Sequence, residues 1–216
     1  MERTKKRALV TGQISGTNAL IYATILGSAG TLTLLWLTNT LTAALALFGL
    51  FAYVVLYGIA KRKSPIGTIV GSVSGAIPPV VGYVASTNQL DSIAVVLFLV
   101  LTAWQMPHFY AIAMYRSKDY KAAGIPVLPL VSGARITQLH IIGYIVLYGL
   151  ALVGLFIVSE LSVAFLAIAL LSALFWLYSS LKGFRALDSN AWARKMFGIS
   201  LLVLLSFCAG TLINLL

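Results

Sequence analysis

Ser92–Tyr115 reads SIAVVLFLVLTAWQMPHFYAIAMY, and no Asp, Glu, Lys or Arg interrupts it. A helix needs about 20 apolar residues to cross about 30 Å of membrane hydrocarbon, and this run is long enough. The other uncharged runs of comparable length are residues 17–36, 41–60, 66–85, 136–158, 161–181 and 196–216. Because hydrocarbon cannot satisfy backbone N–H and C=O groups, these runs must be helical, and they lack the alternation typical of membrane barrel strands. The sequence predicts an all-α, polytopic transmembrane helical bundle.

The basic residues lie only in alternate gaps between these runs, and therefore on one side of the membrane if every run spans it. All 15 Lys and Arg residues lie in alternate gaps, namely residues 1–16, 61–65, 116–135 and 182–195. The intervening gaps contain none, and two of them contain the acids Asp91 and Glu160. Since cytoplasmic loops retain positive charge, we expect a multi-pass protein of the cell inner membrane, with a cytoplasmic N-terminus and a periplasmic C-terminus.

The net charge of +10 therefore has a membrane explanation. Basic loops lie beside anionic headgroups, so the lipid bilayer is the expected partner and nucleic acid is not. A soluble domain could not bury a chain that is 60% hydrophobic and only 9% charged. The single Cys208 excludes an internal disulfide and a cysteine-based metal site.

Residues 66–85 differ from the other runs because they combine small residues with prolines. Gly67, Gly71 and Gly75 are spaced four apart, and Pro78 is followed by Pro79. Small residues at this spacing let helices approach closely, and prolines should kink or break a helix. Close packing and a polar cavity beside a broken helix are both consistent with this pattern.

The most informative segment is residues 104–129, WQMPHFYAIAMYRSKDYKAAGIPVLP. An apolar helix ends near Tyr115 and brings Arg116, Lys118, Asp119 and Lys121 to the membrane boundary. One interpretation is an interfacial anchor, with tyrosines in the aromatic belt and cations near headgroups. The other is a Mg²⁺–pyrophosphate site, because carboxylates suit Mg²⁺ and basic side chains suit phosphate oxygens.

This segment resembles the second signature of the haem O synthases, which belong to the UbiA-type intramembrane prenyltransferases. The similarity is clearest in Tyr-Arg-x-Lys-Asp-Tyr at 115–120 and Ala-Gly-Ile-Pro at 123–126. It extends through MERT at 1–4, VTG at 10–12, GSVSGA at 71–76 with the paired prolines, and WARKMFG at 192–198. Together these motifs cover essentially the whole chain.

The resemblance implies a cytoplasm-facing central cavity where two aspartate-rich motifs hold Mg²⁺ and a prenyl pyrophosphate. The implied reaction joins farnesyl pyrophosphate to a vinyl group of haem B, giving haem O for terminal oxidases, and contact with haem-accepting oxidase assembly proteins is a further expectation. Carried over by position, Asp119 binds Mg²⁺, Arg116 and Lys118 contact the pyrophosphate, and Tyr115 and Tyr120 line the site. The further predicted cofactor-binding residues are Arg3, Arg7, Lys121, Trp104 and Phe109, with Trp104 and Phe109 placed to stabilise an allylic cation.

His108 shares a helical face with Tyr115, since the two are seven residues apart. A hydrogen-bonded core histidine is one interpretation. An ionisable group inside a membrane is also a functional candidate, and the resembled family has histidine in this signature, so haem contact or proton handling is the other.

The resembled family also carries an Asn-x-x-x-Asp-x-x-x-Asp motif ahead of the Met-x-Arg-Thr stretch, where this chain begins. We therefore expect residues 1–216 to be a single, N-terminally truncated domain with seven of nine helices and little transferase activity of its own. Two other functions stay open. One is prenyl transfer to another aromatic acceptor, such as 4-hydroxybenzoate, and the other is a transporter or non-catalytic membrane fragment.

Overall fold

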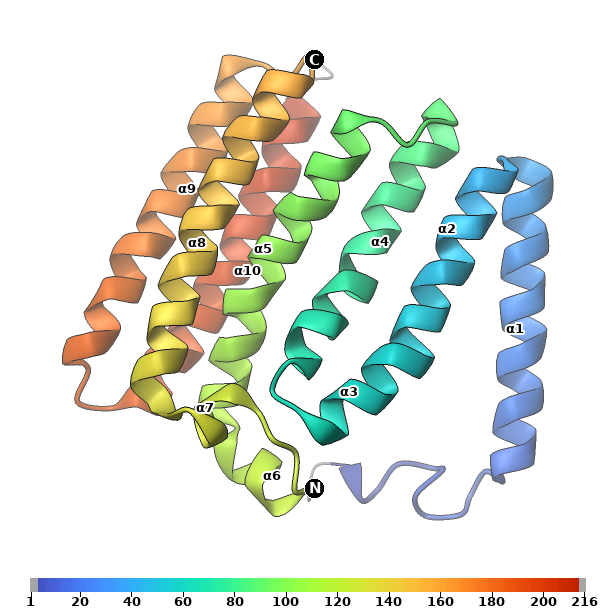
Figure 1. Ribbon diagram of the computed structural model, residues 1–216, viewed down its shortest axis with the longest axis horizontal. Helices are drawn as coiled ribbons and strands as arrows, with labels where there is room; N and C mark the ends of the chain where they lie inside the picture. Colours follow the sequence, from blue (N-terminus) through green and yellow to red (C-terminus); the bar gives the residue numbers. More distant parts are fainter. Residues whose placement is uncertain (1–3, 214–216) are drawn as a thin grey trace.

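The computed structural model describes residues 4–213, and its regular structure is helical. Figure 1 shows long helices side by side, with short helices at the end where α6 and α7 lie. The long helices are α1 (Gly16–Leu37), α2 (Thr40–Phe51), α4 (Gly67–Thr87), α5 (Ser92–Tyr115), α8 (Gly133–Val158), α9 (Val163–Leu181) and α10 (Ser189–Ile213). The shorter ones are η2 (Ala52–Tyr57), α3 (Gly58–Lys63), α6 (Ser117–Ala122), α7 (Leu128–Val131) and η3 (Lys182–Arg185).

Within residues 4–213, seven helical segments are long and apolar enough to span a membrane, which confirms the predicted polytopic bundle. The second segment joins α2, η2 and α3 into one span, Thr40–Lys63. The predicted long loop at 116–135 contains α6 and α7, at the same end of the molecule as α3 (Figure 1). The protein is therefore a multi-pass membrane protein.

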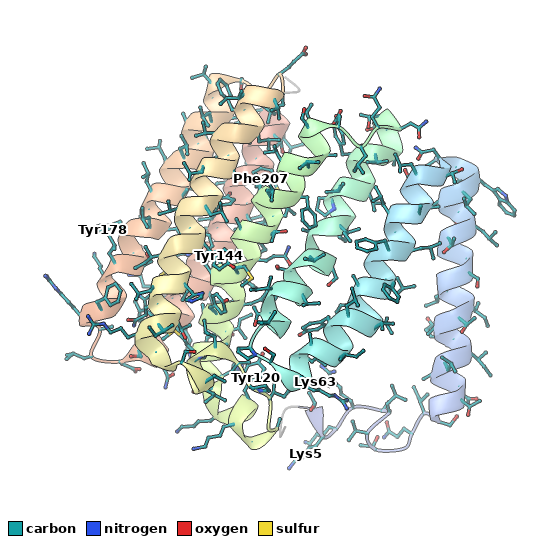
Figure 2. The ribbon with its side chains drawn as sticks, in the orientation of Figure 1. Lys5, Lys63, Tyr120, Tyr144, Tyr178 and Phe207 are labelled. Atoms are coloured by element: carbon teal, nitrogen blue, oxygen red, sulfur yellow. The ribbon has the colours of Figure 1, made fainter. Side chains whose placement is uncertain are left out.

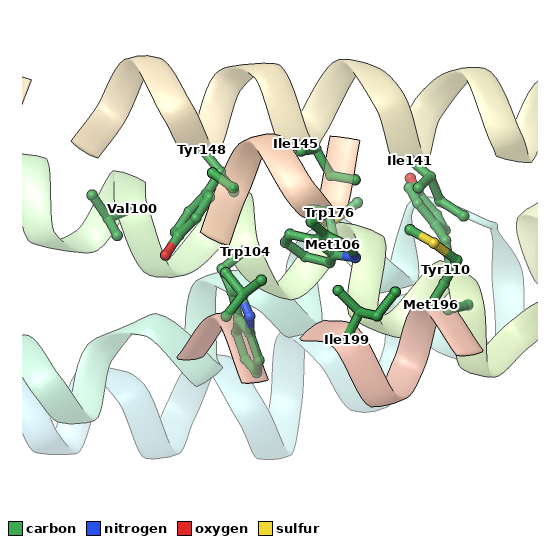
Figure 3. Packing of buried hydrophobic residues seen from close by; sticks show 14 of the residues in the cluster. Val100, Trp104, Met106, Tyr110, Ile141, Ile145, Tyr148, Trp176, Met196 and Ile199 are labelled. Carbon is green, nitrogen blue, oxygen red and sulfur yellow. The ribbon is translucent and has the colours of Figure 1, made fainter. Parts of the chain in front are cut away.

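Helix α5 is the central element of the packing, with α4, α8 and α10 against it. The main buried cluster includes Met106 of α5, Tyr148 of α8, Trp176 of α9 and Met196 of α10. Figure 3 shows these side chains meeting between their helices. In contrast, α1 buries none of its residues and packs along α2. The bundle therefore consists of a tight group around α5, which includes α4, and a looser edge formed by α2 and α1 (Figure 1).

The prolines of α4 do not break it, so the broken helix that the sequence allowed is not observed. The helix continues from Gly67 to Thr87 through both Pro78 and Pro79. Proline removes one backbone donor, but neighbouring helices support the backbone of a membrane helix, and here α2 and α5 pack against α4.

A capped turn joins α4 to α5 at the opposite end of the bundle from α6. The Asp91 side chain accepts a hydrogen bond from the Ala94 N–H and so caps the start of α5. The Tyr83 hydroxyl donates a 2.7 Å hydrogen bond to the same carboxylate and holds the pKa of Asp91 below its usual range. These contacts fix the angle at which the chain enters α5.

Gly67 permits the closest backbone approach between α3 and α4. A Cβ at this position would lie 2.6 Å from the Lys61 Cα. We expect Gly67→Ala to lower the free energy of unfolding by about 1–3 kcal/mol, because the backbone itself must move. The thermal unfolding midpoint in detergent, followed by tryptophan fluorescence, measures the effect.

Gly82→Ala is the matched control, since it lies in the same helix and a Cβ there meets nothing within 4 Å. Its midpoint should stay unchanged or rise slightly, because alanine favours helix over glycine. Equal midpoints for the two variants would contradict the close approach at Gly67.

Candidate functional site

A cavity of about 480 Å³ lies between the second span, α4 and α5, and reaches the α6–α7 segment. Its polar and aromatic lining includes Tyr53, Tyr57, Lys61, Gln105, Phe109 and Tyr120. Lys61 comes from the basic end of α3, whereas Gln105 comes from the interior of α5. The cavity therefore extends from a basic end near the membrane boundary toward the bundle interior, where its walls are aromatic and apolar.

The π-helical turn η2 supplies one wall of the cavity. The rings of Tyr53 and Tyr57 stack with centroids 5.7 Å apart, and the Lys61 ammonium lies 5.1 Å from the Tyr57 ring centroid. Gly71 of α4 makes room for this ring, because a Cβ there would come within 3.0 Å of it. Single π-helical turns inside α-helices occur frequently at functional sites. Here the turn lies where both tyrosines enter the cavity wall.

Gln105 is a buried polar group in the opposite wall, with 5% of its surface exposed. Its Nε2 donates to the carbonyl oxygens of Ser72, at 3.4 Å, and Leu101, at 3.2 Å. A Cβ at Gly75 would collide with Gln105 Oε1, so glycine is what allows the amide to lie there. The amide thus holds a fixed orientation at the cavity surface.

The predicted charged residues lie on or beside α6, and the cavity lining includes none of Arg116, Lys118, Asp119 and Lys121. Tyr120 lines the cavity, whereas Lys118 and Lys121 are exposed. Asp119 is 33% exposed, and its Oδ2 lies 3.7 Å from Nη1 of Arg116. The structure therefore brings the predicted acid and one predicted base together, next to a residue of the cavity wall.

Of the two site residues predicted near the N-terminus, Arg7 lies within the described residues and Arg3 does not. Arg7 is exposed in the irregular segment that precedes α1. Arg3 lies outside the described residues 4–213. Neither residue is placed in the cavity wall by the structure.

The predicted aromatic residues separate onto two faces of α5. Phe109 lines the cavity, whereas Trp104 is buried against α10, where its Nε1 donates a 2.8 Å hydrogen bond to the Ser200 carbonyl. Tyr115 packs edge-on against Phe197 of α10, at 6.0 Å between centroids. Trp104 and Tyr115 therefore do not share the cavity wall with Phe109.

His108 lies at the border between these two faces. Its Nδ1 is 2.7 Å from Ser200 Oγ, and the Ser200 hydroxyl donates a 2.6 Å hydrogen bond to the Phe197 carbonyl. The direction of the His108–Ser200 hydrogen bond depends on the imidazole tautomer. When the Ser200 hydroxyl donates to the Phe197 carbonyl, a neutral His108 ring donates from Nδ1, and Nε2 carries the lone pair. His108 is therefore hydrogen-bonded within the core through Nδ1, as one interpretation predicted.

Tyr53, Tyr57, Lys61 and Gln105 line the cavity but were not predicted as site residues from the sequence. Three of them follow a spacing of four within the second span, ending in the basic cluster at 61–63. Two tyrosines and a lysine on one face of an otherwise apolar helix were a usable signal. Gln105 was a weaker sequence signal: it is a polar amide within the uncharged run 92–115.

The sequence of this chain is similar to those of known membrane prenyltransferases. The profile of the UbiA prenyltransferase family matches residues 1–207. Protoheme IX farnesyltransferase 2 of Pseudomonas paraeruginosa is 48% identical over 205 residues, which cover 94% of this chain and 69% of that protein. Protoheme IX farnesyltransferase of Yersinia pseudotuberculosis is 45% identical over 207 residues, covering 95% of this chain and 70% of that protein.

One solved structure, reported for digeranylgeranylglyceryl phosphate synthase in membranes, has the same fold. It superposes with a TM-score of 0.81 and 17% sequence identity, over 99% of this chain and 76% of that chain. The helical arrangement and the family match over residues 1–207 lead to one conclusion: this chain belongs to the UbiA prenyltransferase family.

Proposed function

We propose that the chain acts in the transfer of a farnesyl group from farnesyl pyrophosphate to a vinyl group of haem B. Pyrophosphate leaves and water supplies a hydroxyl group, which yields haem O. The proposal rests on the 48% identity to a protein named protoheme IX farnesyltransferase 2, over 94% of this chain. The cavity supports it, because an isoprenoid pyrophosphate has a long apolar chain and a strongly anionic end, and the cavity has apolar walls and a basic end.

The pyrophosphate lies at the α6 end of the cavity in this proposal. Arg116 and Lys118 contact its oxygens, Lys61 adds positive charge from α3, and Lys121 with the N-terminal Arg3 and Arg7 contributes to the basic surroundings. Tyr120 borders the pyrophosphate from the cavity wall. Neutralising the charge of a leaving group in a low-dielectric site favours its departure.

Mg²⁺ is the proposed metal, and Asp119 is its proposed protein ligand. Mg²⁺ commonly binds one or two carboxylates together with substrate phosphates and water, so a single partly exposed carboxylate beside the pyrophosphate fits this chemistry. When bound, the ion supplies further neutralisation of the pyrophosphate. Within residues 4–213 no group of three His, Cys, Asp or Glu side chains forms a complete metal site.

The farnesyl chain occupies the apolar part of the cavity, and its reactive end meets aromatic rings. Tyr53, Tyr57 and Phe109 present ring faces or edges to this space. Ring faces attract cations, so these side chains stabilise positive charge that develops on the allylic carbons as the pyrophosphate departs. The orientation of the Gln105 amide adds a fixed dipole in the same wall.

His108 is the proposed contact with the acceptor, either at the haem or in handling a proton. Its ring touches Phe109 of the cavity wall, with centroids 5.5 Å apart, and leaves Nε2 with a lone pair. Haem-accepting oxidase assembly proteins are the proposed recipients of the product.

Product analysis with two acceptors tests the proposed function. The purified chain in lipid nanodiscs is given farnesyl pyrophosphate and Mg²⁺, with either haem B or 4-hydroxybenzoate. We expect formation of haem O, detected by mass spectrometry, and no prenylated benzoate. Prenylated benzoate as the product would overturn the haem acceptor, and the absence of either product would contradict the proposed transfer.

Asp119→Asn tests the metal ligand by binding rather than turnover. The substitution removes the ligand's charge at nearly constant shape, so the Mg²⁺-dependent part of farnesyl pyrophosphate affinity should fall at least about tenfold. Calorimetric titration with and without Mg²⁺ measures this part directly.

Asp188→Asn is the matched control on the same membrane side. The Asp188 carboxylate accepts hydrogen bonds from the N–H groups of Asn190 and Ala191 at the start of α10, and asparagine caps helices equally well. Its Mg²⁺ dependence should equal that of the original chain. An Asp119→Asn chain with the same Mg²⁺ dependence would exclude Asp119 as the metal ligand.

We also propose that the α6 end faces the cytoplasm, in the cell inner membrane. In a Cys208→Ser background, an impermeant maleimide added to spheroplasts should label Gln89→Cys, at the α4–α5 turn, and spare Ser189→Cys, at the start of α10. Both positions are exposed, and they lie at opposite ends of membrane spans. The reverse labelling pattern would invert the proposed orientation.

A further inference from the structure

A row of partly exposed aromatic rings leads from the side of α5 that faces α10 to the cavity wall. We define the aromatic strip as Tyr115, Phe197, His108 and Phe109, all of which are partly exposed. Tyr115 contacts Phe197 at 6.0 Å, Phe197 contacts His108 at 4.9 Å, and His108 contacts Phe109 at 5.5 Å between ring centroids. Since Phe109 also lines the cavity, the strip leads from the membrane boundary to the cavity wall.

Two guanidinium groups lie at the boundary end of the aromatic strip. The Cζ atoms of Arg116 and Arg194 lie 5.4 Å and 5.8 Å from the centroid of the Tyr115 ring. Arg116 lies beside the Asp119 carboxylate, whereas no carboxylate within residues 4–213 forms an ion pair with Arg194. The charge of Arg194 is therefore available to an anion from outside the chain.

Packing fixes the position from which Arg194 extends. Trp192 is buried, and its Nε1 donates a 3.2 Å hydrogen bond to the Ser179 carbonyl of α9. The neighbours Ala193 and Met196 are buried as well, while the Arg194 side chain is exposed. An exposed guanidinium on a rigid helical backbone, held over an aromatic ring, suits recognition of a carboxylate.

We propose that Arg194 binds a propionate carboxylate of the tetrapyrrole acceptor, whose macrocycle lies against the aromatic strip. This inference rests on the proposed function, which supplies the acceptor. Protohaem is flat and apolar, with both propionates on one edge and the vinyl groups on the opposite edge. Anchoring the propionates at Arg194 directs the vinyl edge toward His108 and Phe109, and so toward the cavity that holds the farnesyl donor. An anionic lipid headgroup carries the same charge, but it has no planar ring system that would pack against the aromatic strip.

Haem binding with masked and free propionates tests the assignment. The chain is placed in phosphatidylcholine nanodiscs, which lack anionic headgroups, and titrated with haem B or with haem B dimethyl ester while the Soret absorbance is recorded. The original chain should bind haem B about tenfold more tightly than the ester, as expected for one charge-assisted hydrogen bond. Arg194→Gln should reduce haem B affinity to that of the ester, without changing the affinity for the ester or for farnesyl pyrophosphate.

Lys195→Gln is the matched control, because it removes the same charge from the adjacent exposed residue of α10. It should keep the preference for haem B, and Arg194→Lys should retain part of it. Arg194→Gln behaving like Lys195→Gln would overturn the assignment, as would a loss of farnesyl pyrophosphate affinity instead of haem affinity. A preference for haem B that Arg194→Gln does not reduce would also overturn it.

The failure of the proposed function has a different signature. If the original chain bound neither haem B nor its ester, the acceptor itself would be wrong, and the inference would fall with it. If the original chain and the Arg194→Gln chain both bound haem B more tightly than its ester, and by the same factor, only the role of Arg194 would be wrong.

Discussion

Polar groups at membrane depth must find their partners inside the protein, because hydrocarbon offers none. Helix α5 illustrates this constraint. Trp104 and His108 both hydrogen-bond to Ser200, and Gln105 donates to backbone carbonyls of α4 and of α5 itself. These bonds attach α5 to α10 on one side and to α4 on the other. The position of every functional side chain on α5 follows from this attachment.

The result is one helix that serves two adjacent surfaces. Phe109 and Gln105 face the cavity proposed for the isoprenoid donor, while Tyr115 faces α10 and the strip proposed for the acceptor. His108 lies between them and touches the ring of Phe109. Donor and acceptor can thus meet along a single rigid element, with charged groups gathered at its boundary end (Figure 2).

Only part of the candidate site could be predicted from the sequence. Phe109 and Tyr120 line the cavity as predicted, whereas Trp104 and Tyr115 pack against α10. The position of residues 104–121 at the end of a membrane span was also predictable from the charges. The partners of these residues were less predictable. Tyr53, Tyr57 and Lys61 are spaced four apart, but this spacing did not indicate which helices their common face would meet. Arg194 meets Tyr115 only because α10 packs against α5.

The lengths of the uncharged runs and the placement of Lys and Arg were sufficient to predict the all-α class and the seven spans, since the cost of leaving backbone groups or charges in hydrocarbon applies to each segment separately. Composition could not tell which face of α5 each side chain occupies. That depends on how helices distant in sequence pack, through contacts such as Gly67 against Lys61 and Trp104 against Ser200. Such contacts arise from the shapes of two surfaces together, and neither helix alone encodes them.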